Sequence, residues 1–137
     1  MERQEFCAIL NERRNELEMS WLDMTVATKT NGSTLQKILS GETNFFVESA
    51  WKVMEALKLT LIVEKAGKRY QIMNQAELNA WAEMSKIFAR MSVVKFAEQC
   101  KMSRMALTDN LKGKSKMRID TFLRWADVTG YQIEISK

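Results

Sequence analysis

Basic side chains are the groups in this sequence whose types and spacing point most clearly to chemistry. Between residues 101 and 118 the cations lie close together: Lys101, Arg104, Lys112, Lys114, Lys116 and Arg118. Lysine and arginine at this density can neutralise the phosphates of a nucleic acid. An alternative interpretation is that the last three form a solvated loop with no ligand. The segment therefore predicts a polyanionic partner without identifying it.

Catalytic and metal-binding chemistry has little support in the sequence. The chain has no histidine, and its two cysteines are too few for a zinc site. It also lacks a paired-carboxylate motif, a glycine-rich phosphate loop and a nucleophile motif. We therefore expect neither an enzyme nor a bound cofactor or metal. Cys7 and Cys100 fall in segments that are predicted to be helical, and we expect both to be reduced, packed thiols.

Composition and charge place the chain among mainly helical globular proteins. Of 137 residues, 46% are hydrophobic, none is proline and only 5 are glycine. Residues 1–68 contain 9 Lys/Arg and 10 Asp/Glu, whereas residues 69–137 contain 12 and 7, so the net charge of +4 comes from the second half. No apolar segment approaches the ~20 residues of a membrane span, and the first residues are polar. A cytoplasmic location is expected.

An internal repeat organises the chain. Residues 19–65 align with residues 91–137 at a constant offset of 72, without a gap. Met19-Ser20 matches Met91-Ser92, and Leu39-Ser40-Gly41 matches Leu111-Lys112-Gly113. Few positions are identical, but apolar character is kept at many others. The repeat predicts two domains of the same fold, at residues 1–73 and 74–137.

Each repeat is predicted to contain four helices. They cover about 2–17, 21–28, 32–40 and 47–57 in the first copy, and about 75–90, 93–100, 104–112 and 119–129 in the second. Polar residues stand where N-caps are needed: Ser20, Asn31, Asn74, Ser92 and Ser103. Gly41 and Gly113 stand where the third helix of each copy should end.

Three short strands complete the predicted fold. Residues 59–63, 69–73 and 131–135 are rich in β-branched and aromatic residues, and residues 66–68 are typical of a hairpin turn. Isolated strands are unstable and must pair. We therefore expect one small antiparallel sheet that joins the two repeats, with 131–135 beside the hairpin.

The sequence of each repeat resembles the lambda-repressor/Cro-like helix-turn-helix family. The second copy fits better: from Ser92 to Thr108 the residues Phe96, Ala97, Cys100, Met102 and Leu107 stand at the family's core positions. The resemblance covers nearly the whole chain, twice. It implies a mainly α fold, two tandem lambda-repressor-like helix-turn-helix domains joined by the small sheet, and double-stranded DNA as the partner.

The resemblance also implies which residues meet DNA, because the second helix of such a pair enters the major groove. The candidates are Ser33, Thr34, Gln36 and Lys37 in the first copy and Ser103, Arg104, Met105, Thr108 and Lys112 in the second, with Lys101, Lys114, Lys116 and Arg118 around them. Arg104 suits a bidentate contact to guanine, and Gln36 suits adenine. An alternative for Ser33 and Thr34 is that they only help to cap a helix.

The predicted function is a transcription regulator that acts as an internal pseudo-dimer on an operator. The alternative is a single-site DNA binder whose first domain binds another protein. The near-neutral first half, Trp21 and the adjacent Phe45 and Phe46, which we expect to be exposed, favour that alternative. Asn110 stands where the first copy has Ile38, so it needs a hydrogen-bond partner if it is buried. The sequence leaves further homodimerisation open.

Overall fold

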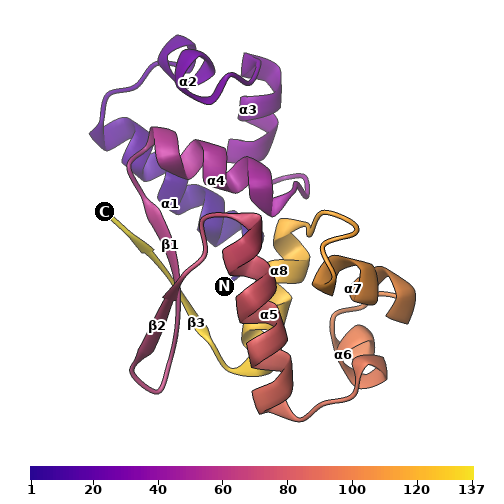
Figure 1. Ribbon diagram of the computed structural model, residues 1–137. Coiled ribbons are helices and arrows are strands. Elements are labelled where there is room, and N and C mark those ends of the chain that lie inside the picture. The colour runs from indigo at the N-terminus through magenta and orange to yellow at the C-terminus, as the bar shows by residue number, and fades with distance from the viewer.

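Eight helices and three strands make up the computed structural model, which describes residues 1–137 (Figure 1). The first helices are α1 (Arg3–Glu16), α2 (Trp21–Thr28), α3 (Gly32–Ser40) and α4 (Val47–Ala56), followed by strands β1 (Thr60–Lys65) and β2 (Lys68–Gln71). Then come α5 (Gln75–Ala89), α6 (Val93–Gln99), α7 (Arg104–Leu111), α8 (Ile119–Thr129) and β3 (Gln132–Ser136). The predicted mainly helical fold with a small antiparallel sheet is confirmed.

The elements occur in two equivalent runs. We name α1–α4 with β1 unit 1, and α5–α8 with β3 unit 2. Their elements begin at residues 3, 21, 32, 47 and 60 in unit 1 and at 75, 93, 104, 119 and 132 in unit 2, so every pair differs by 72. The repeat seen in the sequence is therefore also a repeat of helix and strand order, and strand β2 is the element without a counterpart.

Side-chain caps fix where the helices begin. The side chains of Ser20, Asn31, Asn74, Ser92 and Ser103 each accept a hydrogen bond from a backbone N–H three residues later, as the sequence predicted. At α2 the cap is reciprocal, because the Ser20 backbone N–H also donates to the Asp23 carboxylate, at 2.9 Å. These bonds satisfy N–H groups that a helix leaves free at its first turn.

The sheet joins the two units across a pseudo-twofold axis. Its order is β2-β1-β3, with both pairings antiparallel. In the pairing of β1 with β3, Ile62 lies opposite Glu134, and these two residues are 72 positions apart. An antiparallel pair centred on equivalent residues has a local twofold axis at its centre. The strands of the two units are therefore related as in a symmetric dimer, within one chain.

A second contact lies on the same axis. Phe46 forms an isolated antiparallel bridge with Arg118, again its equivalent at an offset of 72. On either side of this bridge the Val47 N–H donates to the Met117 carbonyl at 2.9 Å, and the Ile119 N–H donates to the Phe45 carbonyl at 2.7 Å. These two bonds exchange under the offset. The axis thus runs from the sheet to the loops that precede α4 and α8.

One continuous core extends through both units. The side chains of Leu61 and Val63 in β1 are fully buried on one face of the sheet. Phe96 stacks on Trp125, with ring centroids 4.4 Å apart. The Trp125 indole N–H donates to the Ser85 hydroxyl at 2.7 Å. Because core residues of the two units touch, we expect the units to unfold together. None of the eight helices has both the length and the apolar character needed to cross a bilayer.

The buried Ser85–Trp125 hydrogen bond yields a stability prediction. Replacing Ser85 with alanine leaves the indole N–H of Trp125 buried without an acceptor, which costs about 1–3 kcal/mol of unfolding free energy. Urea denaturation measures this cost. The matched control is Ser33→Ala at an exposed position, where a change below about 0.5 kcal/mol is expected. Equal effects of the two substitutions would contradict the role assigned to Ser85.

Candidate nucleic-acid interface

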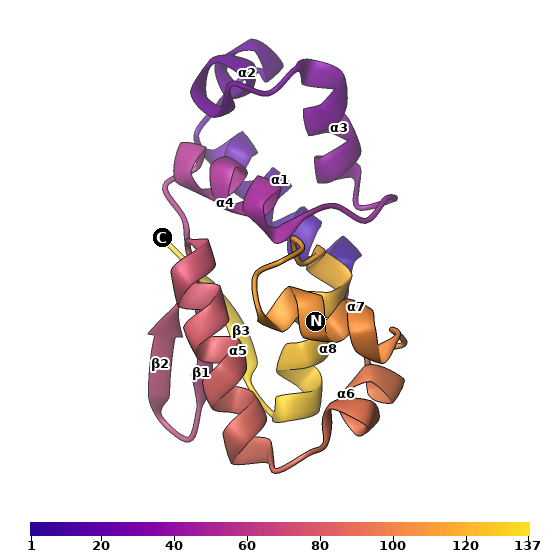
Figure 2. The same ribbon diagram turned by 45° about the vertical axis from the view of Figure 1, so that its right-hand side comes forward.

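Helices α3 and α7 are equivalent, and each leads directly into a loop on the pseudo-twofold axis. Gly41 ends α3 and Gly113 follows α7, both with a φ of 72°. This left-handed conformation turns the chain sharply toward the axis at little cost for glycine. Figures 1 and 2 both show α3 and α7 on the side of the molecule away from β2. The two helices therefore flank the axis on one side of the protein.

Helix α3 presents a polar face beside a buried one. Leu35, Ile38 and Leu39 are buried, whereas the predicted residues Ser33, Thr34, Gln36 and Lys37 are all exposed. The Ser33 hydroxyl donates to the capping oxygen of Asn31 at 3.0 Å, and the Thr34 backbone N–H donates to the same oxygen. The capping alternative therefore applies to the Ser33 side chain, but to Thr34 only through its backbone. Gln36 and Lys37 are free for a ligand.

Helix α7 exposes a cation and an apolar side chain at its beginning. Arg104 is exposed and has no ion-pair partner, and 75% of Met105 is accessible. The Ser103 hydroxyl is engaged as the cap, where it accepts from the Ala106 N–H. Thr108 is half-buried, and its hydroxyl donates back to the Arg104 carbonyl at 2.8 Å. Arg104 and Met105 are thus the predicted residues of this helix that are most available to a ligand.

The basic segment after α7 separates into two groups. Lys112 and Lys114 are exposed and have no ion-pair partner. Lys116 instead pairs with Glu48 of unit 1 at 2.9 Å, and its hydrogen bond lowers the pKa of the Glu48 carboxyl. The Arg118 guanidinium lies 4.5 Å from the centre of the Phe46 ring. Two of the predicted phosphate-binding cations are therefore held against unit 1, and two are free.

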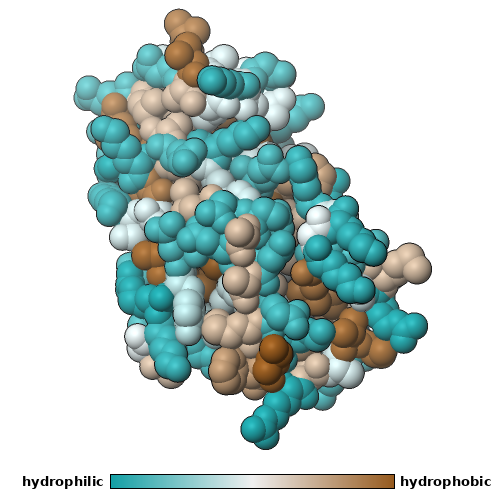
Figure 3. All heavy atoms as spheres, viewed as in Figure 1, coloured by the Kyte–Doolittle hydropathy of each residue, from teal (hydrophilic) through white to brown (hydrophobic).

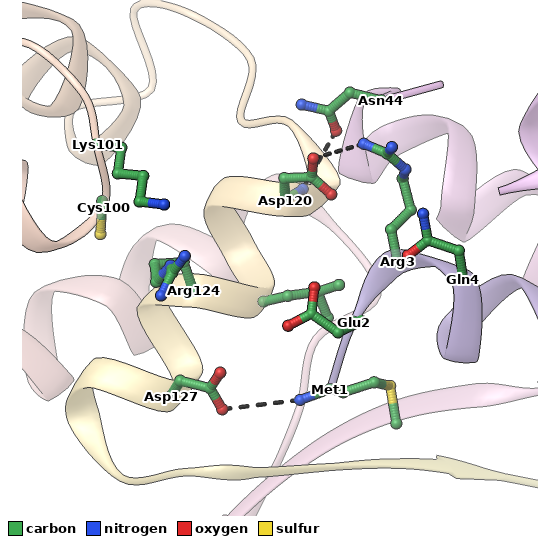
Figure 4. Close-up of a pocket in the computed structure, with 11 residues that line it drawn as sticks. Met1, Glu2, Arg3, Gln4, Asn44, Cys100, Lys101, Asp120, Arg124 and Asp127 are labelled. Carbon is green, nitrogen blue, oxygen red and sulfur yellow. Dashed lines mark hydrogen bonds and ion pairs between the residues drawn. The ribbon is translucent and has the colours of Figure 1, made fainter. Parts of the chain in front are cut away.

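Lys101 lies in a pocket between the units, where sequence reasoning had not placed it. The pocket has a volume of about 400 Å³ and is lined by the start of α1, the turn after α6 and one face of α8. Figure 4 shows Lys101 beside Arg124, with Arg3 contacting Asp120 on the far side at 2.5 Å. Asp120 and Glu48 are equivalent residues, and each forms an ion pair with a cation of the other unit.

The internal repeat is the one sequence feature that pointed to the two ion pairs between the units. Glu48 and Asp120 are both acidic, both follow the first residue of their helix and differ by 72 in number. The cations that pair with these two acids do not stand at equivalent positions, because Arg3 is the first residue of α1 whereas Lys116 lies in the loop between α7 and α8. The position of each acid was therefore readable from the sequence, but its partner was not.

Asn110 has the partner that its position demands. It is buried, and its side-chain amide donates to the Ser115 hydroxyl at 2.7 Å.

The expected exposure of Phe45 and Phe46 is wrong for Phe45, which is only 6% accessible because it packs into the shared core. Trp21 is half-buried, with the Arg14 guanidinium 4.3 Å from its ring centre. Phe46 is exposed, and the most exposed apolar side chains of unit 1 are Leu22 and Val26.

The two thiols are expected to be chemically inert. Both are buried and unpaired, as expected, and the Cys7 thiol donates to the Ile38 carbonyl at 3.1 Å. Burial raises the pKa of Cys7 and of Cys100 to about 11. At pH 8 the thiolate fraction of each is then about a hundredfold below that of a free cysteine.

Alkylation with iodoacetamide measures this inertness. At pH 8 the folded protein should react with neither thiol over a period in which the urea-unfolded chain reacts at both. Because a raised pKa keeps the proton on sulfur, reactivity should increase only as the pH approaches about 11. Rapid labelling of the folded chain at pH 8 would contradict the burial of these groups.

Comparisons with family models, with curated proteins and with solved structures gave no match to this chain.

Proposed function

We propose that the chain is a sequence-specific DNA-binding transcription regulator whose two helix-turn-helix units act as an internal pseudo-dimer on a double-stranded operator. The observation that carries the proposal is the axis: α3 and α7 are equivalent helices that flank a pseudo-twofold axis on one side of the molecule. Duplex DNA has twofold axes of its own between its strands, so two related helices can enter successive major grooves. A cytoplasmic location belongs to the same proposal.

The exposed side chains support this function by their chemistry. Gln36 on α3 can bond the edge of adenine, and Arg104 at the start of α7 can form a bidentate contact to guanine. Lys37, Lys112 and Lys114 are free cations beside these helices and suit phosphate oxygens. Since the two helices carry different residues, the operator should be asymmetric. The more basic unit 2 should supply most of the salt-dependent affinity.

The first test is selection of a binding site from a random duplex library, followed by binding measurements on the selected site. Arg104→Ala should weaken binding by about 10- to 100-fold and relax base preference at one position. Lys114→Ala should weaken binding to all sequences alike and reduce the slope of log affinity against log salt by about 1. Lys68→Ala, on the hairpin, serves as the control and should leave affinity unchanged.

Footprinting on the selected site distinguishes the pseudo-dimer from a single-site binder. Two protected half-sites about one helical turn apart are expected if α3 and α7 bind together. Protection of one half-site alone would contradict the internal pseudo-dimer. A library that yields no preferred sequence, with binding that Arg104→Ala leaves intact, would contradict sequence-specific recognition altogether.

The alternative, in which unit 1 binds a protein, now depends on Leu22 and Val26. These two side chains are 72% and 71% accessible and lie one helical turn apart on α2. The double variant Gln36→Ala, Lys37→Ala separates the two functions. The pseudo-dimer predicts a loss of at least tenfold in affinity for the selected duplex. Unchanged affinity would instead mean that unit 1 does not contact DNA.

A further inference from the structure

Apolar side chains are exposed at both ends of the molecule. Leu22 and Val26 form one surface on α2, which we name the head patch, with accessibilities of 72% and 71%. Ile87 and Phe88 at the end of α5, with Val94 at the start of α6, form the tail patch, with accessibilities of 62%, 69% and 55%. Figure 3 shows hydrophobic surface over α2 at the upper tip and over the lower end of α5. Neighbouring exposed apolar side chains can contribute to an interaction surface.

The internal repeat shows that the fold does not require the apolar residues of the tail. The positions of Ile87 and Phe88 on α5 correspond to Asn15 and Glu16 on α1. The same helix end therefore forms in unit 1 with polar side chains. Val26 provides the converse case, because its counterpart on α6 is Glu98. At these three positions each unit carries an exposed apolar residue where the other carries a polar one, whereas Leu22 and Val94 are equivalent and are both apolar and exposed. The fold therefore does not require an apolar side chain at Val26, Ile87 or Phe88.

Charges beside the two patches are opposite in sign at equivalent positions. Glu18 lies in the turn before α2, and Asp23 follows Leu22 on α2; both are exposed. Their counterparts at the tail patch are Arg90 and Lys95. None of the four has an ion-pair partner within the chain, since every ion pair of the structure involves other residues. The exposed Lys29, three residues after Val26, reduces the negative charge of the head. At the tail, Lys86 adds to the positive charge and Glu98 reduces it. The head of one molecule therefore complements the tail of another.

We propose that a second copy of this chain binds head to tail, with the head patch of one molecule against the tail patch of the next. Contact between two heads or two tails would bring like charges together. Head-to-tail contact instead brings the acidic residues Glu18 and Asp23 of one molecule toward the basic residues Arg90 and Lys95 of the next. Such an interface is heterologous and leaves a free head and a free tail at the ends of every oligomer, so assembly is open-ended. The patches are small, so the association is weak and depends on concentration. Nothing in this assembly requires DNA.

Sedimentation velocity of the full chain tests the assembly from about 10 μM to about 1 mM, the range expected for small interfaces. The blocked-tail variant Ile87→Asn, Phe88→Glu introduces the residues that unit 1 has at these positions. The blocked-head variant is Leu22→Ser, Val26→Glu, in which the second substitution introduces the residue that unit 2 has. The wild type should form progressively larger species, and each variant should associate at least tenfold more weakly. An equimolar mixture of the two variants keeps one intact interface and should stop at a dimer. Circular dichroism and thermal melting verify that both variants fold.

Three outcomes would overturn the proposal. The first is a wild type that stays monomeric at the highest concentration. The second is loss of association in the blocked-tail variant alone, which indicates a symmetric tail-to-tail dimer. The third is a mixture of folded variants that does not dimerise.

Exchanging charges between the head and the tail provides an independent test of the head-to-tail arrangement. Glu18→Arg and Arg90→Glu should each weaken self-association, because each places like charges across the interface. The double variant Glu18→Arg, Arg90→Glu restores opposite charges and should recover at least part of the affinity. Lys68→Glu changes an exposed charge on the hairpin, away from both patches, and should have no effect. Failure of the double variant to recover would contradict the proposed pairing.

Discussion

The antiparallel pairing of β1 with β3 determines how the rest of the structure is arranged. A shift of this pairing by one residue would turn Leu61 and Val63 from the core to the opposite face of the sheet, because side chains alternate along a strand. Burial of these two residues therefore selects the register in which Ile62 meets Glu134. That register places the twofold relation at the centre of the sheet. The loops before α4 and α8 then meet as equivalents, and α3 and α7 follow them to one side of the protein.

Local structure was largely predictable from the sequence because its causes are local. Ser20, Asn31 and Ser103 cap helices through bonds that span three residues, and Gly41 ends a helix through its own backbone conformation. The strands were displaced from their predicted bounds by one or two residues, since pairing partners decide where a strand ends. A repeat of 72 residues was also visible, because it requires only that a pattern recur.

Contacts between the units were not predictable, because they depend on which surfaces meet. Phe45 shows the difference: a phenylalanine after a polar loop suggests exposure, yet the bridge between Phe46 and Arg118 draws this loop into the shared core. Lys116 is likewise indistinguishable from Lys114 in sequence, and only the approach of Glu48 separates them. The helices that carry the candidate residues form where the sequence predicted them, whereas the ion pairs of the cations around them were not predictable. Sequence reasoning assigned Lys101 to the same set as Arg104, whereas the fold directs it toward α8.

The hairpin of β1 and β2, with its turn at Ala66 and Gly67, connects the units covalently. In a dimer of separate chains, dilution dissociates the partners, and every substitution occurs twice. Here the partner unit is held at a local concentration that does not depend on how much protein a cell makes. A substitution also alters one half alone. The connection thus lets a twofold framework carry two surfaces that change independently, and the unlike charges of Glu18 and Arg90 are an instance of that freedom.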